Sequence, residues 1–257
     1  MPAPDVPPID RSPDESVVGA YFSRLNEILE DDKNPKSVAA AFVQQLKAKH
    51  SISALETMTE MDRLYREMRS VLNEFTGRGY FLVHILTVEH LATAMKLYVI
   101  SWHTMLDLLA RLVNAVFNLG IADRDVTPRL ILTNAHVKAT RIPEILAAYE
   151  KALPVEDLRK RRNDAVHRGR IPDPDVEQLL KERNTLDSRR YSLLTISPIS
   201  EEEYKNGTAA LQTRLNAMAK EKQSLWEQIH QQTSAMTSAV ASELAVKAIE
   251  RLKREAI

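Results

Sequence analysis

An arginine and a histidine five positions apart, near the middle of the chain, have side chains that could act together on a phosphodiester. Arg162 is followed directly by Asn163, and His167 comes four residues later. Histidine exchanges protons near neutral pH, and arginine can donate two hydrogen bonds to phosphoryl oxygens. Attack of a ribose 2′-hydroxyl on the adjacent phosphate needs a proton acceptor and a fixed cation of this kind. These residue types therefore suit cleavage of RNA.

The positive charge of the chain is concentrated around these residues. The 257 residues contain 35 Lys and Arg against 35 Asp and Glu, so the formal net charge is zero. We therefore do not expect the protein to bind nucleic acid through its overall charge, and any RNA binding should depend on local cations. Alternatively, such cations only stabilise the C-terminal end of a helix through its dipole. The local cations, named here the basic cluster, are Arg159, Lys160, Arg161, Arg168 and Arg170.

A short helix should carry the arginine and the histidine. Pro154 is placed to begin this helix and Gly169 to end it, which predicts a helix over residues 154–168. Asn163 and His167 are four residues apart and share a face, whereas Arg162 and His167 are about 140° apart on an ideal helix. We expect the long side chain of Arg162, or fraying at Gly169, to bring both groups to one substrate.

A long apolar helix should lie at the centre of the protein. Apolar residues recur in alternating steps of four and three from Leu91 to Val116, and further apolar side chains widen this face. We expect the polar stripe of this helix to support the helix with the arginine and histidine, although Asp107 could simply pair with Arg111. His103 and Asp107 have a spacing that can also hold a divalent metal, but a third ligand is not evident. The stripe consists of Lys96, His103, Asp107, Arg111 and Asn114.

The other helices are marked by capping boxes and N-terminal prolines. Capping boxes begin at Ser12, Ser53 and Ser200, and residues 120–140 have the pattern of a loop. With only 6 glycines, the chain is expected to be an all-α, up-and-down helical bundle with a long central helix and a long C-terminal helix. The C-terminal helix is either a coiled-coil arm or the outer helix of the bundle. The expected helices span about 12–30, 35–49, 53–76, 91–116, 143–152, 154–168, 173–194 and 200–255.

We expect three regions along the chain. Residues 1–11 are predicted to be a disordered tail, residues 12–78 an N-terminal helical unit, and residues 79–257 a bundle with a C-terminal helical extension. The last two regions could also form one continuous domain. The apolar stretch from Tyr80 to Phe117 carries too many ionisable groups to cross a membrane. Since Met1 to Pro13 lacks the order of a secretory signal, we expect a cytoplasmic protein that is not bound to a membrane.

Several classes of site are excluded by composition. The chain has no cysteine, which excludes disulfides and thiolate metal sites. It also lacks a glycine-rich phosphate loop and the Gly-x-Ser-x-Gly turn of serine hydrolases. We therefore expect no cofactor and no metal.

The order Arg162-Asn163-x-x-x-His167 after a long apolar helix, in an all-helical chain without cysteine, resembles the signature of the HEPN superfamily. The resemblance covers about residues 80–170. It implies a four- or five-helix bundle that is usually a dimer, with the motif helices of two subunits forming one site. Family members with an intact motif are commonly metal-independent endoribonucleases, often in toxin–antitoxin and antiviral systems. It also implies that Arg162 binds phosphate and that His167 is the general acid or base, with Asn163 as the polar residue that often follows the arginine.

The residues and the resemblance together favour a metal-independent endoribonuclease, or an RNA-binding relative of one, that acts as a homodimer. An antitoxin or another protein could be a further partner. A toxin branch of the family has a tyrosine two places after the histidine, where this chain has Gly169. The alternative is a non-catalytic helical scaffold whose long C-terminal helix pairs with a partner. The nuclease needs Arg162 and His167 exposed, whereas the scaffold allows them to be buried.

Overall fold

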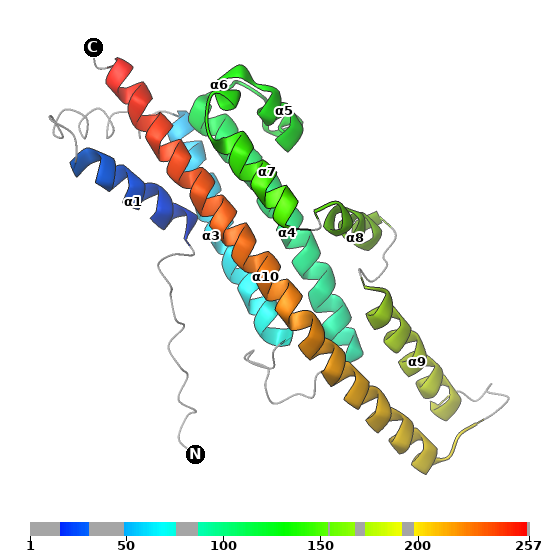
Figure 1. Cartoon of the computed structure of the whole chain (residues 1–257). Coiled ribbons are helices and arrows are strands. Elements are labelled where there is room, and N and C mark those ends of the chain that lie inside the picture. The colour runs from blue at the N-terminus through cyan, green and yellow to red at the C-terminus, as the bar shows by residue number, and fades with distance from the viewer. Residues whose placement is uncertain are drawn as a thin grey trace. The chain divides into compact units, whose positions relative to one another are not determined.

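The computed structural model describes residues 16–30, 49–75, 87–153, 155–167, 173–191 and 198–255. Within these ranges the chain is helical and has no strand, which confirms the predicted all-α fold with a long central and a long C-terminal helix (Figure 1). None of the described helices is long and apolar enough to cross a membrane. The elements are α1 (Val17–Glu30), α3 (Lys49–Phe75), α4 (Val88–Phe117), the 3₁₀ turn η2 (Asp123–Asp125), α5 (Pro128–Thr133), α6 (Ala135–Lys138), α7 (Ile142–Ala152), α8 (Val155–His167), α9 (Pro174–Tyr191) and α10 (Glu201–Glu255).

The start of α10 follows directly from the local sequence. The Ser200 N–H donates to Glu203 Oε2 at 2.8 Å, and the Glu203 N–H donates to Ser200 Oγ at 3.1 Å. This reciprocal pair is the predicted capping box, and it satisfies two backbone donors at the helix N-terminus. The 55-residue helix therefore begins where the sequence indicates.

Two predictions about local structure are wrong. Helix α3 begins at Lys49, so Ser53 lies inside it, and the Ser53 carbonyl accepts a hydrogen bond from Thr57 Oγ1 at 2.7 Å. A Ser-x-x-Glu spacing fits one turn of helix interior as well as an N-terminus, and the preceding residues continue the helix. Residues 120–140 contain η2, α5 and α6 in place of a loop, because Thr127 caps α5 and Pro128 occupies its first turn.

Other predictions lie outside the described residues. These include the disordered tail at 1–11, the capping box at Ser12 and most of the helix expected at 35–49. The division of the chain into regions 12–78 and 79–257 stays a prediction.

The chain forms two compact units. Unit 1 comprises residues through Asp62, Leu109–Leu146 and Ser234 onward, and unit 2 comprises Arg63–Leu108 and Ala147–Thr233. Helices α3, α4, α7 and α10 contribute residues to both units. In unit 1, the Asp62 carboxylate accepts hydrogen bonds from the Ser16 hydroxyl at 2.8 Å and from the Val17 N–H at 2.7 Å, so α3 caps the start of α1.

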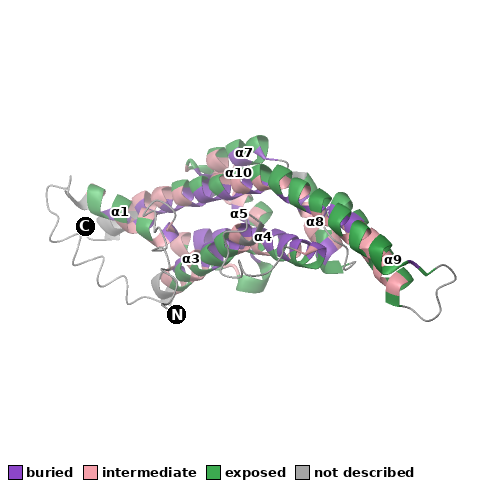
Figure 2. Cartoon of the chain, turned by 90° about the horizontal axis from the view of Figure 1, so that it is seen from below, coloured by how far each residue is buried: buried purple, intermediate pink, exposed green. Residues whose placement is uncertain are grey.

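The core of unit 2 combines apolar packing with a chain of buried hydrogen bonds. Trp102 Nε1 donates to the Tyr149 hydroxyl at 2.7 Å, and that hydroxyl lies 2.9 Å from Thr233 Oγ1. These contacts join α4, α7 and α10. The ring of Tyr98 packs edge-on against that of Trp226, with 4.9 Å between centroids. Buried residues recur along α4 and α10, whereas α9 is mainly exposed or half-buried (Figure 2).

Helix α9 pairs with the first part of α10. The Tyr204 hydroxyl donates to Asp187 Oδ1 at 2.8 Å, and Arg183 donates to the same hydroxyl at 3.2 Å. A methyl group at Gly207 would lie 2.9 Å from Leu186 Cδ1, which shows how closely the two helices approach. The two helices therefore form one packed hairpin within unit 2.

Candidate functional site

The motif helix α8 has a buried inner side and an exposed outer side. Leu158 and Ala165 are buried and define its inner side. Asn163 and His167 are exposed, and Arg162 is half-buried at the margin between the two sides. Val166, 44% exposed, lies between Arg162 and Asn163 around the helix. The helix thus presents polar groups to the outside on the turns that hold the motif.

A hydrogen bond joins two residues of the motif. Arg162 Nη1 donates to Asn163 Oδ1 at 3.2 Å. Asn163 is one turn before His167, the last residue of α8. The contact with Asn163 therefore draws the guanidinium from its position at the margin toward the side that carries His167. The sequence left open how Arg162 and His167, about 140° apart around the helix, would reach one substrate. The hydrogen bond from Arg162 to Asn163 shortens this separation.

The basic cluster is divided by its contacts. Arg159 Nη2 donates to Glu150 Oε1 of α7 at 3.1 Å, so a carboxylate already compensates its charge. Lys160 is exposed and shares a helix side with Asn163 and His167 at spacings of three and seven. Arg168 and Arg170 lie outside the described residues. We name the exposed residues Lys160, Asn163 and His167, together with the half-buried Arg162, the motif face.

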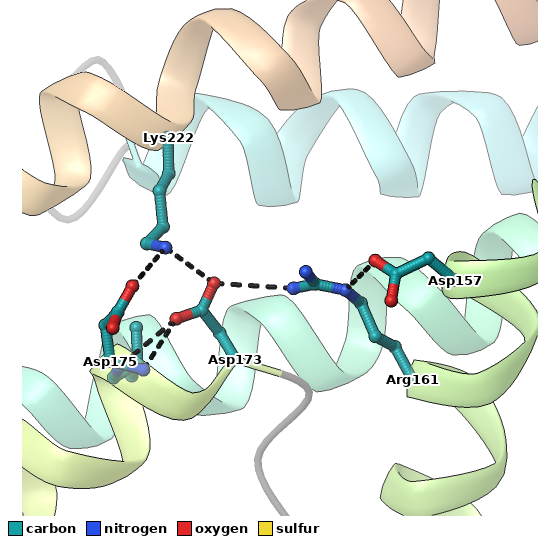
Figure 3. Close-up of polar contacts among 6 residues, drawn as sticks. Asp157, Arg161, Asp173, Asp175 and Lys222 are labelled. Carbon is teal, nitrogen blue, oxygen red and sulfur yellow. Dashed lines mark hydrogen bonds and ion pairs between the residues drawn. The ribbon is translucent and has the colours of Figure 1, made fainter. Parts of the chain in front are cut away.

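Arg161 belongs to a network that joins three helices (Figure 3). Its Nε donates to Asp157 Oδ2 at 2.6 Å, and its Nη1 lies 3.4 Å from Asp173 Oδ2. Asp173 is 3% exposed and caps α9, since its Oδ1 accepts from the backbone N–H groups of Asp175 at 3.0 Å and Val176 at 3.3 Å. Lys222 Nζ of α10 lies 2.7 Å from Asp173 Oδ2 and 3.0 Å from Asp175 Oδ2.

The central pair of this network is charged at neutral pH. Burial acts to raise the pKa of Asp173, but the hydrogen bond and charge of Lys222 and the two backbone donors outweigh it, so the pKa lies below its ordinary value. Burial acts to lower the pKa of Lys222, and the two aspartates outweigh it and raise that pKa. From the sequence, Asp173 was predicted only to begin a helix. The Asp-Pro pair signals a cap, but nothing local signals burial between an arginine and a lysine.

The polar stripe of α4 makes local contacts. His103 Nδ1 lies 3.3 Å from Asp107 Oδ2, one turn away in the same helix. Asn114 is buried, donates to the Ile121 carbonyl at 2.9 Å and accepts from the Ile121 N–H at 3.4 Å, so it holds the turn after α4. Lys96 is half-buried and Arg111 is exposed. A role of the stripe in supporting α8 stays a prediction.

No metal site is apparent in the part of the chain that the structure describes. No three His, Cys, Asp or Glu side chains gather there closely enough to hold an ion. His103 and Asp107 therefore form a pair without a third candidate ligand among those residues.

Comparison with known proteins relates this geometry to a family. Residues 83–230, more than half of the chain, match the family model described as HEPN_Cthe2314-like HEPN. The matched range includes α4, α8 and α9 together with the first part of α10. No curated protein matches the chain, and no solved structure matches it.

Proposed function

Since the chain belongs to the HEPN_Cthe2314-like HEPN family, we propose that it is a metal-independent endoribonuclease whose reacting groups are Arg162 and His167. The observation that carries the proposal is the motif face of α8. There an exposed histidine follows, after one turn, the asparagine that binds the guanidinium of Arg162. A scaffold would have no need to keep these groups accessible.

The reaction follows from the chemistry of the two side chains. The guanidinium of Arg162 would bind the non-bridging phosphoryl oxygens and stabilise the negative charge that develops on them. A neutral His167 would accept the proton of the 2′-hydroxyl as its oxygen forms a bond to phosphorus. The bond from phosphorus to the 5′-oxygen breaks, and that oxygen takes a proton. The products are a 2′,3′-cyclic phosphate and a free 5′-hydroxyl.

The second proton transfer favours a homodimer. A single His167 cannot be the base and the acid in the same step, whereas the histidines of two subunits related by a two-fold axis can take one role each. Val166 supports such an arrangement, because it leaves an apolar side chain 44% exposed within the motif. We therefore propose that two copies of α8 meet and that the RNA strand lies across both motif faces.

The test is cleavage of a fluorescent single-stranded RNA in the presence of EDTA. His167→Ala should lower the rate by about 10² to 10⁴, the usual contribution of a general acid or base. Arg162→Ala should also abolish measurable cleavage. Arg214→Ala is the matched control, because Arg214 of α10 forms an ion pair with Glu182 of α9 that includes no residue of the motif face.

Two results would contradict the proposal. A loss of cleavage rate below tenfold for His167→Ala would show that His167 is not the residue that transfers the proton. Absence of EDTA-resistant cleavage by the wild-type protein, with any pool of RNA, would favour the non-catalytic interaction module.

A further inference from the structure

Helix α8 has little apolar anchorage for a helix that must hold reacting groups. Among residues 157–167, whose side chains the structure describes, Leu158 and Ala165 are the buried ones. Alanine contributes a small buried area, so hydrophobic packing alone leaves the rotation of α8 about its axis weakly determined. Polar contacts must therefore help to set which side faces outward.

Asp173 is a fixed point against which α8 can be oriented. One carboxylate oxygen is held by two backbone N–H groups at the start of α9, and the other is held by Lys222 of α10 (Figure 3). The carboxylate is thus attached to the α9–α10 hairpin. The guanidinium of Arg161 reaches it from α8 and also binds Asp157, one turn earlier in α8.

We propose that Arg161 is a positioning residue, which orients α8 by joining Asp157 to the buried Asp173 and so sets the outward side of the motif face. Arg161 immediately precedes Arg162, and a rotation of α8 that breaks the contact with Asp173 would move Arg162 and His167 together. Its effect on catalysis rests on the proposed function, whereas its effect on α8 does not.

The planar fork of arginine is required for this role. Nε is directed to Asp157 while Nη1 is directed to Asp173, so two carboxylates are contacted from one rigid group. The ammonium of lysine is a single point charge on a flexible stem and cannot reproduce both directions at once. Arg161→Lys therefore keeps the positive charge but loses the simultaneous contact with Asp157 and Asp173.

Amide hydrogen exchange of the unliganded protein tests the positioning directly. In Arg161→Lys, the amides of α8 should exchange about tenfold faster or more, because one hydrogen bond to a buried charge is lost. In Asp173→Asn the cap of α9 is kept by the asparagine, and α8 should again exchange faster. Buried α10 amides near Trp226 should not change in Arg161→Lys. Arg214→Lys makes the same chemical change at an exposed pair and should leave α8 as in the wild type.

The kinetic test uses the same variants on single-stranded RNA. Arg161→Lys should lower kcat by about tenfold to a hundredfold through misplacement of the reacting groups, with a smaller change in KM because the positive charge is kept. The double variant that combines Arg161→Lys with Asp173→Asn should cleave RNA no more slowly than Asp173→Asn alone. The reason is that both changes remove the same contact, between Arg161 and Asp173.

Each outcome has one interpretation. Unchanged exchange of α8 in both Arg161→Lys and Asp173→Asn overturns the inference. Slower cleavage without faster exchange also overturns it, because Arg161 would then act on RNA directly. Faster exchange in a protein whose wild type cleaves no RNA supports the positioning role and refutes the proposed function.

Discussion

His230 is a titratable residue that lies wholly inside unit 2. Its side chain is fully buried, and neither ring nitrogen has a hydrogen-bond partner among the described residues. The ring packs edge-on against Tyr65, with 5.2 Å between centroids, and at 6.4 Å from the ring of Tyr98. Burial, and then the positive charge of Arg69, lower the pKa of His230 from 6.5 to about 4. The residue is therefore neutral in the folded protein at pH 7.

This burial predicts a dependence of stability on pH. Below pH 6.5 the unfolded chain binds a proton at His230 that the folded chain does not bind until about pH 4. The free energy of unfolding should therefore fall as the pH is lowered through this window, by about 3 kcal/mol. His230→Phe should remove this part of the pH dependence. Urea unfolding at pH 7 and pH 4.5 measures it, with the exposed His90→Phe as control. Equal pH dependence in wild type and His230→Phe would contradict the prediction.

At the same scale, Lys160 and Arg159 should differ in their contribution to RNA binding. Lys160 lies on the motif face, whereas the charge of Arg159 is already compensated by Glu150. Lys160→Gln should weaken binding and reduce the slope of log affinity against log salt by about 0.7, the effect of one lost phosphate contact on a single strand. Arg159→Gln should change both quantities less. Binding titrations at several salt concentrations measure the slope. An equal effect of Lys160→Gln and Arg159→Gln would show that the two residues do not differ in their contribution to RNA binding.

Among the elements, α7 connects the core of unit 2 to the motif helix. Tyr149, near its end, accepts a hydrogen bond from Trp102 of α4 and bonds to Thr233 of α10. Burial raises the pKa of its hydroxyl, although the bonds to Thr233 and Trp102 act in the opposite direction. Because α8 begins three residues after α7 ends, the placement of α7 restricts that of α8.

Tyr149→Phe should therefore destabilise the protein. The substitution keeps the ring but leaves the buried Trp102 Nε1–H without its acceptor, which costs about 1 to 3 kcal/mol. Urea unfolding measures the change in free energy. Tyr191→Phe is the control, because Tyr191 is 68% exposed and should change stability little. A loss of less than 0.5 kcal/mol (the usual range of about ±0.5 for surface substitutions) would mean that the buried bonds contribute little.

At the scale of the whole molecule, the proposed dimer can be tested by a single introduced cysteine. The chain has no cysteine, so Val166→Cys would provide one thiol per subunit, on the motif helix. If two α8 helices meet at a two-fold axis, mild oxidation should join the subunits, since a disulfide needs the two Cβ atoms within about 4.5 Å.

The control for this prediction is Lys205→Cys, which places an exposed thiol on α10. Analytical ultracentrifugation of the wild-type protein at micromolar concentration should show a dimer. A monomer, or crosslinking of Lys205→Cys but not of Val166→Cys, would mean that the motif helices do not meet.

The elements of this protein were predictable because helices depend on local patterns. The apolar repeat of α4 and the capping box at Ser200 are each contained in a few consecutive turns, and both were placed from sequence. The same local rules misplaced the start of α3, since Ser53 and Glu56 have the same spacing inside a helix as at its end. They also overlooked α5, although Thr127 and Pro128 carry its start signal.

By itself, the sequence determined the all-α class and the helix that carries Arg162, Asn163 and His167, because each depends on residues within a few turns. Only the tertiary structure decided the contact of Arg161 with Asp173, the exposure of Asn163 and His167, and the burial of His230. Arg161 meets Asp173 across 12 positions, and Lys222 meets Asp175 across 47. A charged side chain has the same local pattern whether it faces solvent or a buried carboxylate. The choice between those environments is made by packing between helices, which periodicity does not encode.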